Sequence, residues 1–188
     1  MRQLLGGFAL LLLTFALLVP SATAAGPIKI GIIQGLSGPY EIYGKAEVTG
    51  FKMGLEYFTH GTNKILGRDV KLFIEDTQLK AARAKMLLTK LYSDDKVDLA
   101  VGPTSSGVAL AVLPVARDFK KILIVEPAVA DAITGSHWNR YIFRTGRNSS
   151  QDAISNAAAV AKPGVSIACI GQDYAFGRDG IAAYKQAA

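Results

Sequence analysis

The sequence has few of the residues that form covalent crosslinks or metal sites, with one Cys, two His and one Trp among 188 residues. A single cysteine excludes an internal disulfide, so packing alone must hold the fold. Cys169 lies in the apolar run VSIACI, which predicts a small buried core residue rather than a reactive thiol. His60 and His137 lie away from other metal-ligating residue types, so we expect surface histidines, no metal site and no cofactor.

The sequence also lacks the glycine-rich and nucleophile motifs of common α/β enzymes. Gly38 and Gly44 are one residue too far apart for a phosphate-binding loop, and Ala46 stands where that motif needs Ser or Thr. No G-x-G-x-x-G follows the first apolar strand-like run, and the surroundings of Ser105 do not match G-x-S-x-G. The sequence therefore favours a protein that is not an enzyme, and an α/β enzyme is the weakest alternative.

The positive charge of the chain is not gathered into a patch. The formal net charge is +6, from 21 Lys and Arg against 15 Asp and Glu, and these residues are scattered along the chain. Basic residues with no interleaved aromatics do not make a nucleic-acid surface. We therefore expect no nucleic-acid partner.

The first residues have the pattern of a secretory signal peptide. Arg2 precedes an almost wholly apolar run from Leu4 to Val19, and Ala22-Thr23-Ala24 follows as a small-x-small cleavage site. The run is shorter than the roughly 20 residues of a membrane span, and no cysteine stands at the cleavage site for a lipid anchor. We expect cleavage near Ala24 and a soluble periplasmic or secreted protein.

Apolar runs and amphipathic segments alternate along the rest of the chain. Unbroken aliphatic runs predict strands buried on both faces, and helices between them predict a parallel sheet. The predicted strands are 28–33, 70–75, 98–101, 122–125, 141–144 and 165–170, and the predicted helices are 44–60, 79–92, 107–119, 149–160 and one from 176. The fold class is therefore α/β, with a doubly wound parallel sheet in a Rossmann-like lobe and the start of a second, similar lobe.

A polar stretch, TGRNSS, divides the chain into two predicted parts. We expect an incomplete N-terminal lobe at 25–145 and the start of a second lobe at 146–188. The chain stops inside a helical pattern with no Gly or Pro stop signal, which predicts a truncated chain.

Several predicted strands end in loops that would meet at one edge of a parallel sheet. The clearest is GPTSSG, where Ser105 and Ser106 open a helix after a strand. Backbone N–H groups, the positive end of the helix dipole and a serine hydroxyl can together bind a carboxylate there. The same serines also fit a simple N-cap, and one serine can serve both purposes. Other loops supply Ser37, Tyr40, Tyr43, Asp131, Tyr174 and Phe176.

The order of these motifs resembles the Leu/Ile/Val-type periplasmic binding proteins, which are the substrate-binding components of ABC importers. The resemblance covers 28–188 and rests on SGPYEIYG, GPTSSG, EPAVADAITG, YIFRTGRNSSQ and QDYAFGRDG, in that order. It implies the type 1 periplasmic binding fold, in which two Rossmann-like lobes close on a ligand, and a function without catalysis.

The resemblance also implies which residues contact the ligand. Ser105 and Ser106 match the helix start that takes a ligand carboxylate, and Tyr43 matches an aromatic residue beside the ligand side chain. Phe176 matches a tyrosine of the second lobe. The candidate ligand-binding residues are therefore Tyr43, Ser105, Ser106, Ala128, Val129, Asp131, Tyr174 and Phe176.

Two departures from the amino-acid binders bear on the ligand. Ala130-Asp131 replaces the usual threonine, and Phe176 lacks the tyrosine hydroxyl, so two groups that orient an α-amino acid are missing. The remaining rings favour an aromatic acid, and the sequence around EPAVADAITG resembles the subgroup that binds plant-derived aromatic acids. The alternative is a branched-chain amino acid, with Asp131 pairing with its ammonium group. We expect Arg144 and Arg147 to stabilise the junction between the two lobes rather than to contact the ligand.

The resemblance implies a monomeric receptor that captures a small carboxylate and delivers it to an ABC permease at the inner membrane. The alternative function is a sensory or regulatory module of the same fold that binds an amide or amino acid. Because the family's second lobe supplies part of the ligand contacts, we expect a truncated chain to bind its ligand weakly or not at all.

Overall fold

The structure is a computed structural model that describes residues 26–188. The predicted signal peptide lies outside these residues. Within 26–188, none of the helices combines the length and apolar character that a membrane crossing requires.

A six-stranded sheet forms the centre of the fold, with the strand order β2-β3-β1-β4-β5-β6. Every neighbouring pair is parallel except β2 and β3. The strands are β1 (Ile28–Gln34), β2 (Lys64–Ile65), β3 (Arg68–Asp76), β4 (Leu99–Val101), β5 (Ile122–Val125) and β6 (Ile142–Arg144). The predicted doubly wound α/β class is confirmed, with β1 at the position where the strand order reverses direction.

The hairpin of β2 and β3 is an element that the apolar pattern did not predict. Leu66 and Gly67 connect the two strands, with φ values of 50° and 75°. Two consecutive residues with positive φ are typical of a type I′ hairpin turn. β2 has only two residues, so it leaves almost no periodic signal in the sequence.

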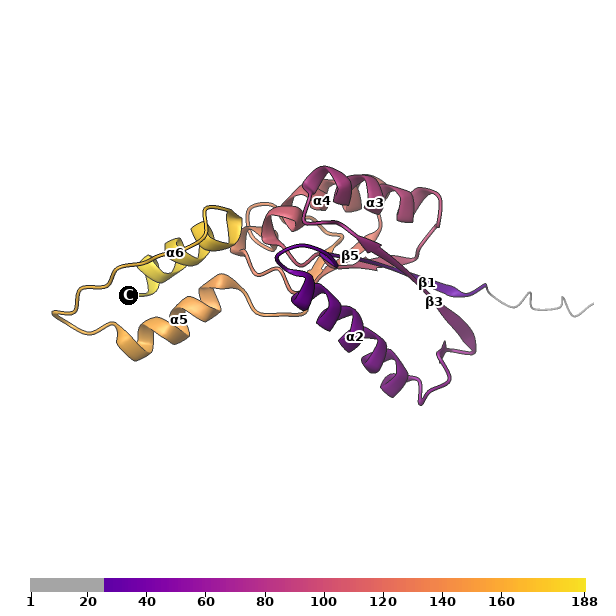
Figure 1. The fold of residues 1–188 in the computed structure, drawn as a ribbon, viewed down its shortest axis with the longest axis horizontal. Coiled ribbons are helices and arrows are strands. Elements are labelled where there is room, and N and C mark those ends of the chain that lie inside the picture. The colour runs from indigo at the N-terminus through magenta and orange to yellow at the C-terminus, as the bar shows by residue number, and fades with distance from the viewer. Residues whose placement is uncertain (1–25) are drawn as a thin grey trace, which may run out of the picture.

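Helices cover the two faces of the sheet unequally (Figure 1). The helices are α2 (Glu41–Phe58), α3 (Ala81–Ser93), α4 (Ser106–Phe119), α5 (Ser149–Val160) and α6 (Ala175–Ala187), with a short 3-10 helix η1 (Asp131–Ile133). α3 and α4 lie side by side on one face, and α2 lies on the other. The five predicted helices are all present, with ends within three residues of the prediction.

The hydrophobic core lies between the sheet and the pair α3 and α4. Each large aliphatic side chain buried there stabilises the fold by about 1.5–3 kcal/mol. Its most deeply buried members include Ile33, Leu88, Leu91, Val112, Leu113, Leu123 and Val125. α2 contributes little to burial, because its only buried residue is Gly44 and Phe58 is 69% exposed.

The predicted strand at 165–170 is wrong, because this segment has no regular secondary structure. A strand needs a neighbour to pair its backbone groups, and nothing in the described part of the chain lies beside this segment as a strand. Ile170 is therefore fully exposed. Cys169 is also exposed, so the prediction of a buried core cysteine is wrong as well.

The chain beyond β6 forms a separate pair of packed helices. Figure 1 shows α5 and α6, in orange and yellow, extending away from one end of the sheet. The two helices pack against each other, and α6 also contacts α4. This arrangement places the beginning of α6 near the beginning of α4.

Candidate functional site

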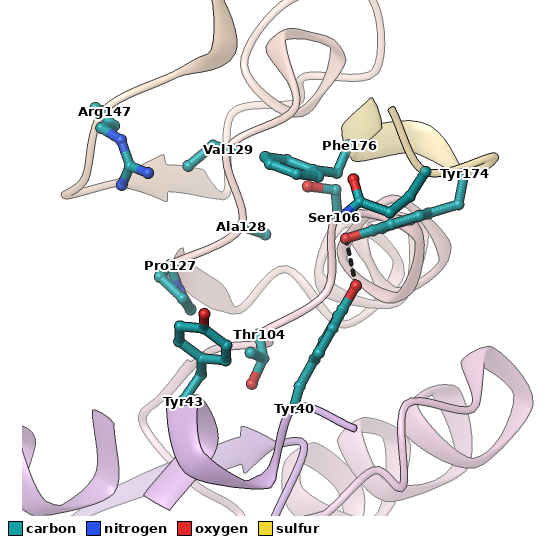
Figure 2. Close-up of a pocket in the computed structure, with 11 residues that line it drawn as sticks. Tyr40, Tyr43, Thr104, Ser106, Pro127, Ala128, Val129, Arg147, Tyr174 and Phe176 are labelled. Carbon is teal, nitrogen blue, oxygen red and sulfur yellow. Dashed lines mark hydrogen bonds between the residues drawn. The ribbon is translucent and has the colours of Figure 1, made fainter. Parts of the chain in front are cut away.

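A pocket with a volume of about 310 Å³ lies where the carboxyl ends of the parallel strands meet α4 and α6. In doubly wound folds, ligands bind at this edge, beside the position where the strand order reverses. The volume is at the small end of the range of known ligand pockets. The pocket is lined by Tyr40, Tyr43, Thr104, Ser106, Pro127, Ala128, Val129, Arg147, Gln172, Tyr174 and Phe176 (Figure 2).

Ser106 is the first residue of α4 and lies at one side of this pocket. Its side chain is nearly buried, with 2% exposed, and its Oγ accepts a hydrogen bond from the Ala130 backbone N–H at 3.2 Å. The hydroxyl proton of Ser106 remains available as a donor to a ligand. The side chain of the N-cap residue Ser105 makes no capping hydrogen bond to α4, so the first backbone N–H groups of this helix too can bind an anion.

The loop that leads from β4 into α4 is fixed by a glycine and a threonine. Gly102 has φ +119°, and a Cβ there would lie 2.1 Å from the Ile33 carbonyl oxygen, so only glycine fits. Thr104 donates from Oγ1 to Gln34 Oε1 at 2.8 Å and accepts from the Gly35 backbone N–H at 3.1 Å. Thr104 thus joins the loops that follow β1 and β4 and holds the start of α4 in place.

Four aromatic side chains form much of the pocket wall. The hydroxyl groups of Tyr40 and Tyr174 lie 2.8 Å apart in a hydrogen bond between the loop before α2 and the start of α6 (Figure 2). Burial, together with the hydrogen bond to Tyr40 and the charge of Tyr40, raises the pKa of Tyr174. The Tyr174 phenol therefore stays protonated at neutral pH. Tyr43 lies edge-on to Tyr40, and Phe176 lies beside Tyr174 with 6.0 Å between ring centroids.

The loop after β5 supplies an apolar wall. Ala128 and Val129 are 3% and 5% exposed, and Pro127 precedes them in the same loop. Small buried residues at this position leave room for a flat ligand between them and the aromatic rings. The structure thus brings together six of the predicted site residues: Tyr43, Ser106, Ala128, Val129, Tyr174 and Phe176.

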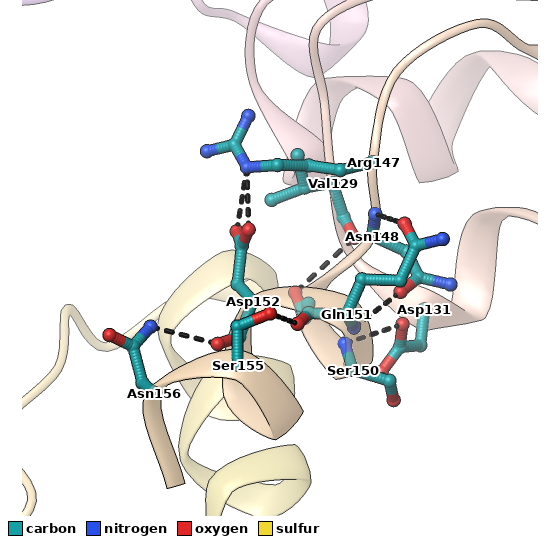
Figure 3. Close-up of polar contacts among 10 residues, drawn as sticks. Val129, Asp131, Arg147, Asn148, Ser150, Gln151, Asp152, Ser155 and Asn156 are labelled. Atoms are coloured by element: carbon teal, nitrogen blue, oxygen red, sulfur yellow. Dashed lines mark hydrogen bonds and ion pairs between the residues drawn. The ribbon is translucent and has the colours of Figure 1, made fainter. Parts of the chain in front are cut away.

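Two other predicted site residues lie outside this pocket. Asp131 accepts hydrogen bonds from the backbone N–H of Ser150 at 3.1 Å and from its Oγ at 2.6 Å (Figure 3). Its carboxylate therefore fixes the start of α5. Ser105 is the N-cap residue of α4, with extended backbone angles and no capping hydrogen bond from its side chain, and it does not line the pocket.

Arg147 lines the pocket, although the sequence pattern assigned it to the lobe junction. It follows β6 and directly precedes Asn148, the N-cap of α5. Asn148 and Gln151 form a reciprocal capping box, with N···O distances of 2.8 and 2.9 Å (Figure 3). Because β6 is parallel to its neighbour, the loop after β6 reaches the same edge of the sheet as the other loops. The predicted parallel sheet could therefore have indicated that Arg147, in this loop, lies near the pocket.

Arg144 behaves as a structural residue. Its Nη1 donates to the Ala130 carbonyl oxygen at 2.9 Å, and its Nη2 donates to Thr134 Oγ1. Burial lowers the pKa of Arg144, and the charge of Asp131 partly opposes this shift. These contacts hold the loop after β5 against β6.

Two carboxylates, those of Glu47 and Glu126, lie near each other and near Thr104 of the pocket wall. Glu47 of α2 has a buried Oε2 atom without a hydrogen-bond partner in the described part of the chain. Burial, and then the nearby charge of Glu126, raise the pKa of Glu47 to about 7. Gln34 donates from Nε2 to the Glu126 carbonyl oxygen at 3.0 Å, and Thr145 donates to the Glu126 carboxylate. These two hydrogen bonds join the chain segments at the ends of β1, β5 and β6.

The pocket combines hydrogen-bond donors with apolar walls. Within residues 26–188, the titratable side chains that line it are Arg147 and the three tyrosines. A helix start, hydroxyl groups and apolar walls can hold an anion and bury its apolar part.

Comparisons with known proteins agree with this geometry. The family described as "Periplasmic binding protein" matches residues 27–188. A solved ABC-type branched-chain amino acid transporter from Rhodopseudomonas palustris is 59% identical, with a TM-score of 0.75, and the match covers 85% of this chain and 43% of that one. The Leu/Ile/Val-binding protein homolog 6 of Brucella abortus is 28% identical over 90% of this chain and 43% of its own length.

A third similar protein was solved with an aromatic acid. It is a solute binding protein of an ABC transporter from Rhodopseudomonas palustris, in complex with 3,4-dihydroxy benzoic acid. It is 28% identical, with a TM-score of 0.78, over 86% of this chain and 43% of that one. The chain thus spans less than half the length of these relatives. Since the family match extends over the whole sheet, the pocket and both following helices, the chain belongs to the periplasmic binding protein family.

Proposed function

We propose that the chain is part of a solute-binding protein of an ABC importer that captures a small carboxylate and catalyses no reaction. The observation that carries this proposal is the uncapped start of α4 beside the Ser106 hydroxyl, inside a pocket with apolar walls. Backbone N–H groups and a hydroxyl can compensate a buried negative charge without an ion pair. The family membership agrees with a periplasmic location and an ABC permease as partner.

The ligand that fits this pocket best is an aromatic acid. An α-amino acid carries an ammonium group, which needs a carboxylate or several carbonyl groups when it is buried. Within residues 26–188, no carboxylate lines the pocket, and Asp131 is hydrogen-bonded to Ser150. The rings of Tyr40, Tyr43 and Phe176 can instead pack on a flat apolar ring. The relative bound to 3,4-dihydroxy benzoic acid supports this ligand class.

The mechanism that we propose is capture between two lobes. Residues 25–145 would form the first lobe and 146–188 the beginning of the second, which meet at the pocket. The carboxylate would bind first at α4, and the second lobe would then close over the ring. The hydrogen bond between Tyr40 and Tyr174 is the kind of contact that would hold this closed arrangement. The closed, monomeric receptor would then present its surface to the permease.

A thermal-shift screen of the protein encoded by its full gene tests this proposal. A ligand that binds only the folded state raises the unfolding midpoint, and the increase grows with its concentration. We expect benzoate and hydroxybenzoates to raise the midpoint, and leucine, short amides and urea to leave it unchanged. A rise with leucine alone would contradict the aromatic-acid assignment. No rise with any carboxylate would contradict the proposed function itself.

A further inference from the structure

The pocket has a second polar side, formed by Arg147. Figure 2 shows Arg147 on the side of the pocket away from Ser106, Tyr40 and Tyr174. Its Nε donates to both carboxylate oxygens of Asp152, at 2.7 and 2.8 Å. Within residues 26–188, neither Nη group makes a hydrogen bond or an ion pair, so these N–H donors are open to a ligand.

The position of Arg147 is set by the start of α5. The capping box of Asn148 and Gln151 fixes the backbone that directly follows Arg147. Asp152, in the first turn of α5, then holds the guanidinium through Nε (Figure 3). A guanidinium that is held through Nε keeps its two Nη groups for a second partner. Such a group is well suited to a carboxylate, which it can bind through two parallel hydrogen bonds.

The space between the two polar sides is apolar. Pro127, Ala128 and Val129 line it from the loop after β5, and Figure 2 shows the Phe176 ring close to Val129 and Ser106. A carboxylate at the start of α4 would therefore be followed by an apolar body that ends near Arg147. An anionic group at that end would gain hydrogen bonds from Arg147 that a plain hydrocarbon end cannot make.

We infer that the pocket selects an aromatic acid with a second anionic group on the far side of its ring. The first carboxylate binds at Ser106 and the start of α4, the ring packs between Val129 and Phe176, and the second carboxylate binds the Nη groups of Arg147. The inference rests on the proposed function, because it assumes that the first carboxylate binds at α4. It assigns Arg147 as the residue that makes the pocket bind diacids more tightly than monoacids.

The test compares benzoate with benzene-1,4-dicarboxylate by isothermal titration calorimetry on the protein encoded by its full gene. The wild type should bind the diacid at least about tenfold more tightly than benzoate, since hydrogen bonds to charged groups are strong. Arg147→Gln should weaken the diacid until the two dissociation constants lie within about twofold of each other, because the second carboxylate loses its hydrogen bonds. The side chain of Arg147 is 61% exposed, so this substitution is compatible with folding.

A matched control is available in α6. Arg178 pairs with Asp173 five residues away, as Arg147 pairs with Asp152, but it does not line the pocket. Arg178→Gln should therefore leave the preference for the diacid at its wild-type value.

Two outcomes would overturn the inference alone. They are no preference for the diacid in the wild type and an unchanged preference in Arg147→Gln. If the preference stayed unchanged because that variant lost affinity for both ligands equally, the first carboxylate would be placed at Arg147. If the wild type bound neither compound, the proposed function would fail, and the inference would fail with it.

Discussion

At the scale of single residues, Ser106 is the side chain on which the carboxylate site depends most. Ser106→Ala removes a hydroxyl donor but leaves the helix start intact. We expect it to weaken carboxylate binding by about 1–3 kcal/mol, because a buried charge loses a hydrogen bond. Calorimetry with benzoate measures this loss. Ser105→Ala is the matched control, since Ser105 adjoins Ser106 but does not line the pocket, and an equal loss in both variants would contradict the assignment.

A second prediction at this scale concerns Glu47, whose burial lowers the free energy of unfolding when its carboxyl group is ionised. Its pKa is raised to about 7 by burial and by Glu126, so the folded state holds a proton that the unfolded state releases near pH 4.5. The folded chain therefore loses stability as the pH rises from about 4.5 to about 7. Glu47→Gln should remove this loss and raise the free energy of unfolding at pH 8 by about 1–2 kcal/mol, a figure reduced for partial solvent screening.

Chemical denaturation at pH 5 and pH 8 checks this prediction. The control is Glu56→Gln, which changes an exposed glutamate of the same helix and should leave the pH dependence unchanged. If the wild type gained more stability between pH 5 and pH 8 than Glu47→Gln does, the predicted direction of the pH dependence would be wrong.

At the scale of elements, the contact between Tyr40 and Tyr174 links the loop before α2 to the start of α6. A double-mutant cycle of Tyr40→Phe and Tyr174→Phe isolates the energy of this hydrogen bond. We expect a coupling of about 0.5–1.5 kcal/mol in the free energy of unfolding, as is usual for a bond between neutral groups. The cycle of Tyr43→Phe with Tyr174→Phe should show no coupling. A zero coupling for the first pair would mean that the two elements are not joined by this bond.

The elements that the sequence predicted well are those with strong periodic patterns. β1 and α4 lie where unbroken aliphatic residues or helical spacing indicated them, because burial by the sheet requires those patterns. The β2–β3 hairpin was missed because its turn residues are Leu66 and Gly67 rather than a typical Asn-Gly pair. The strand at 165–170 was predicted from composition, but a strand forms only where another strand can pair with it.

Only part of the candidate site could be predicted from the sequence, because some of its features depend on contacts that form in the folded chain. Ser106 and the aromatic residues follow strand ends, so their convergence follows from a parallel sheet. Asp131 lies outside the pocket because its carboxylate is hydrogen-bonded to Ser150. The spacing of residues in the sequence does not indicate this contact. The role of Arg147 likewise depends on which of its nitrogen atoms pairs with Asp152. Contacts of this kind are properties of the folded chain and leave no periodic signal.

At the scale of the whole molecule, the pocket is built from parts that lie far apart in the sequence. The first part supplies the helix start and the small apolar residues, and the helices after β6 supply Tyr174 and Phe176. Under the proposed function, a ligand in this pocket would touch both parts at once, so that ligand binding and the approach of the two parts would be coupled.

The central claim is that the pocket binds the negative charge of a small aromatic acid, and a pair of isosteric ligands tests it most directly. Benzoate and benzamide have the same shape, but only benzoate carries a charge for the start of α4 to bind. We predict by isothermal titration calorimetry that the protein encoded by its full gene binds benzoate at least about tenfold more tightly than benzamide. Equal dissociation constants, or tighter binding of benzamide, would contradict this account.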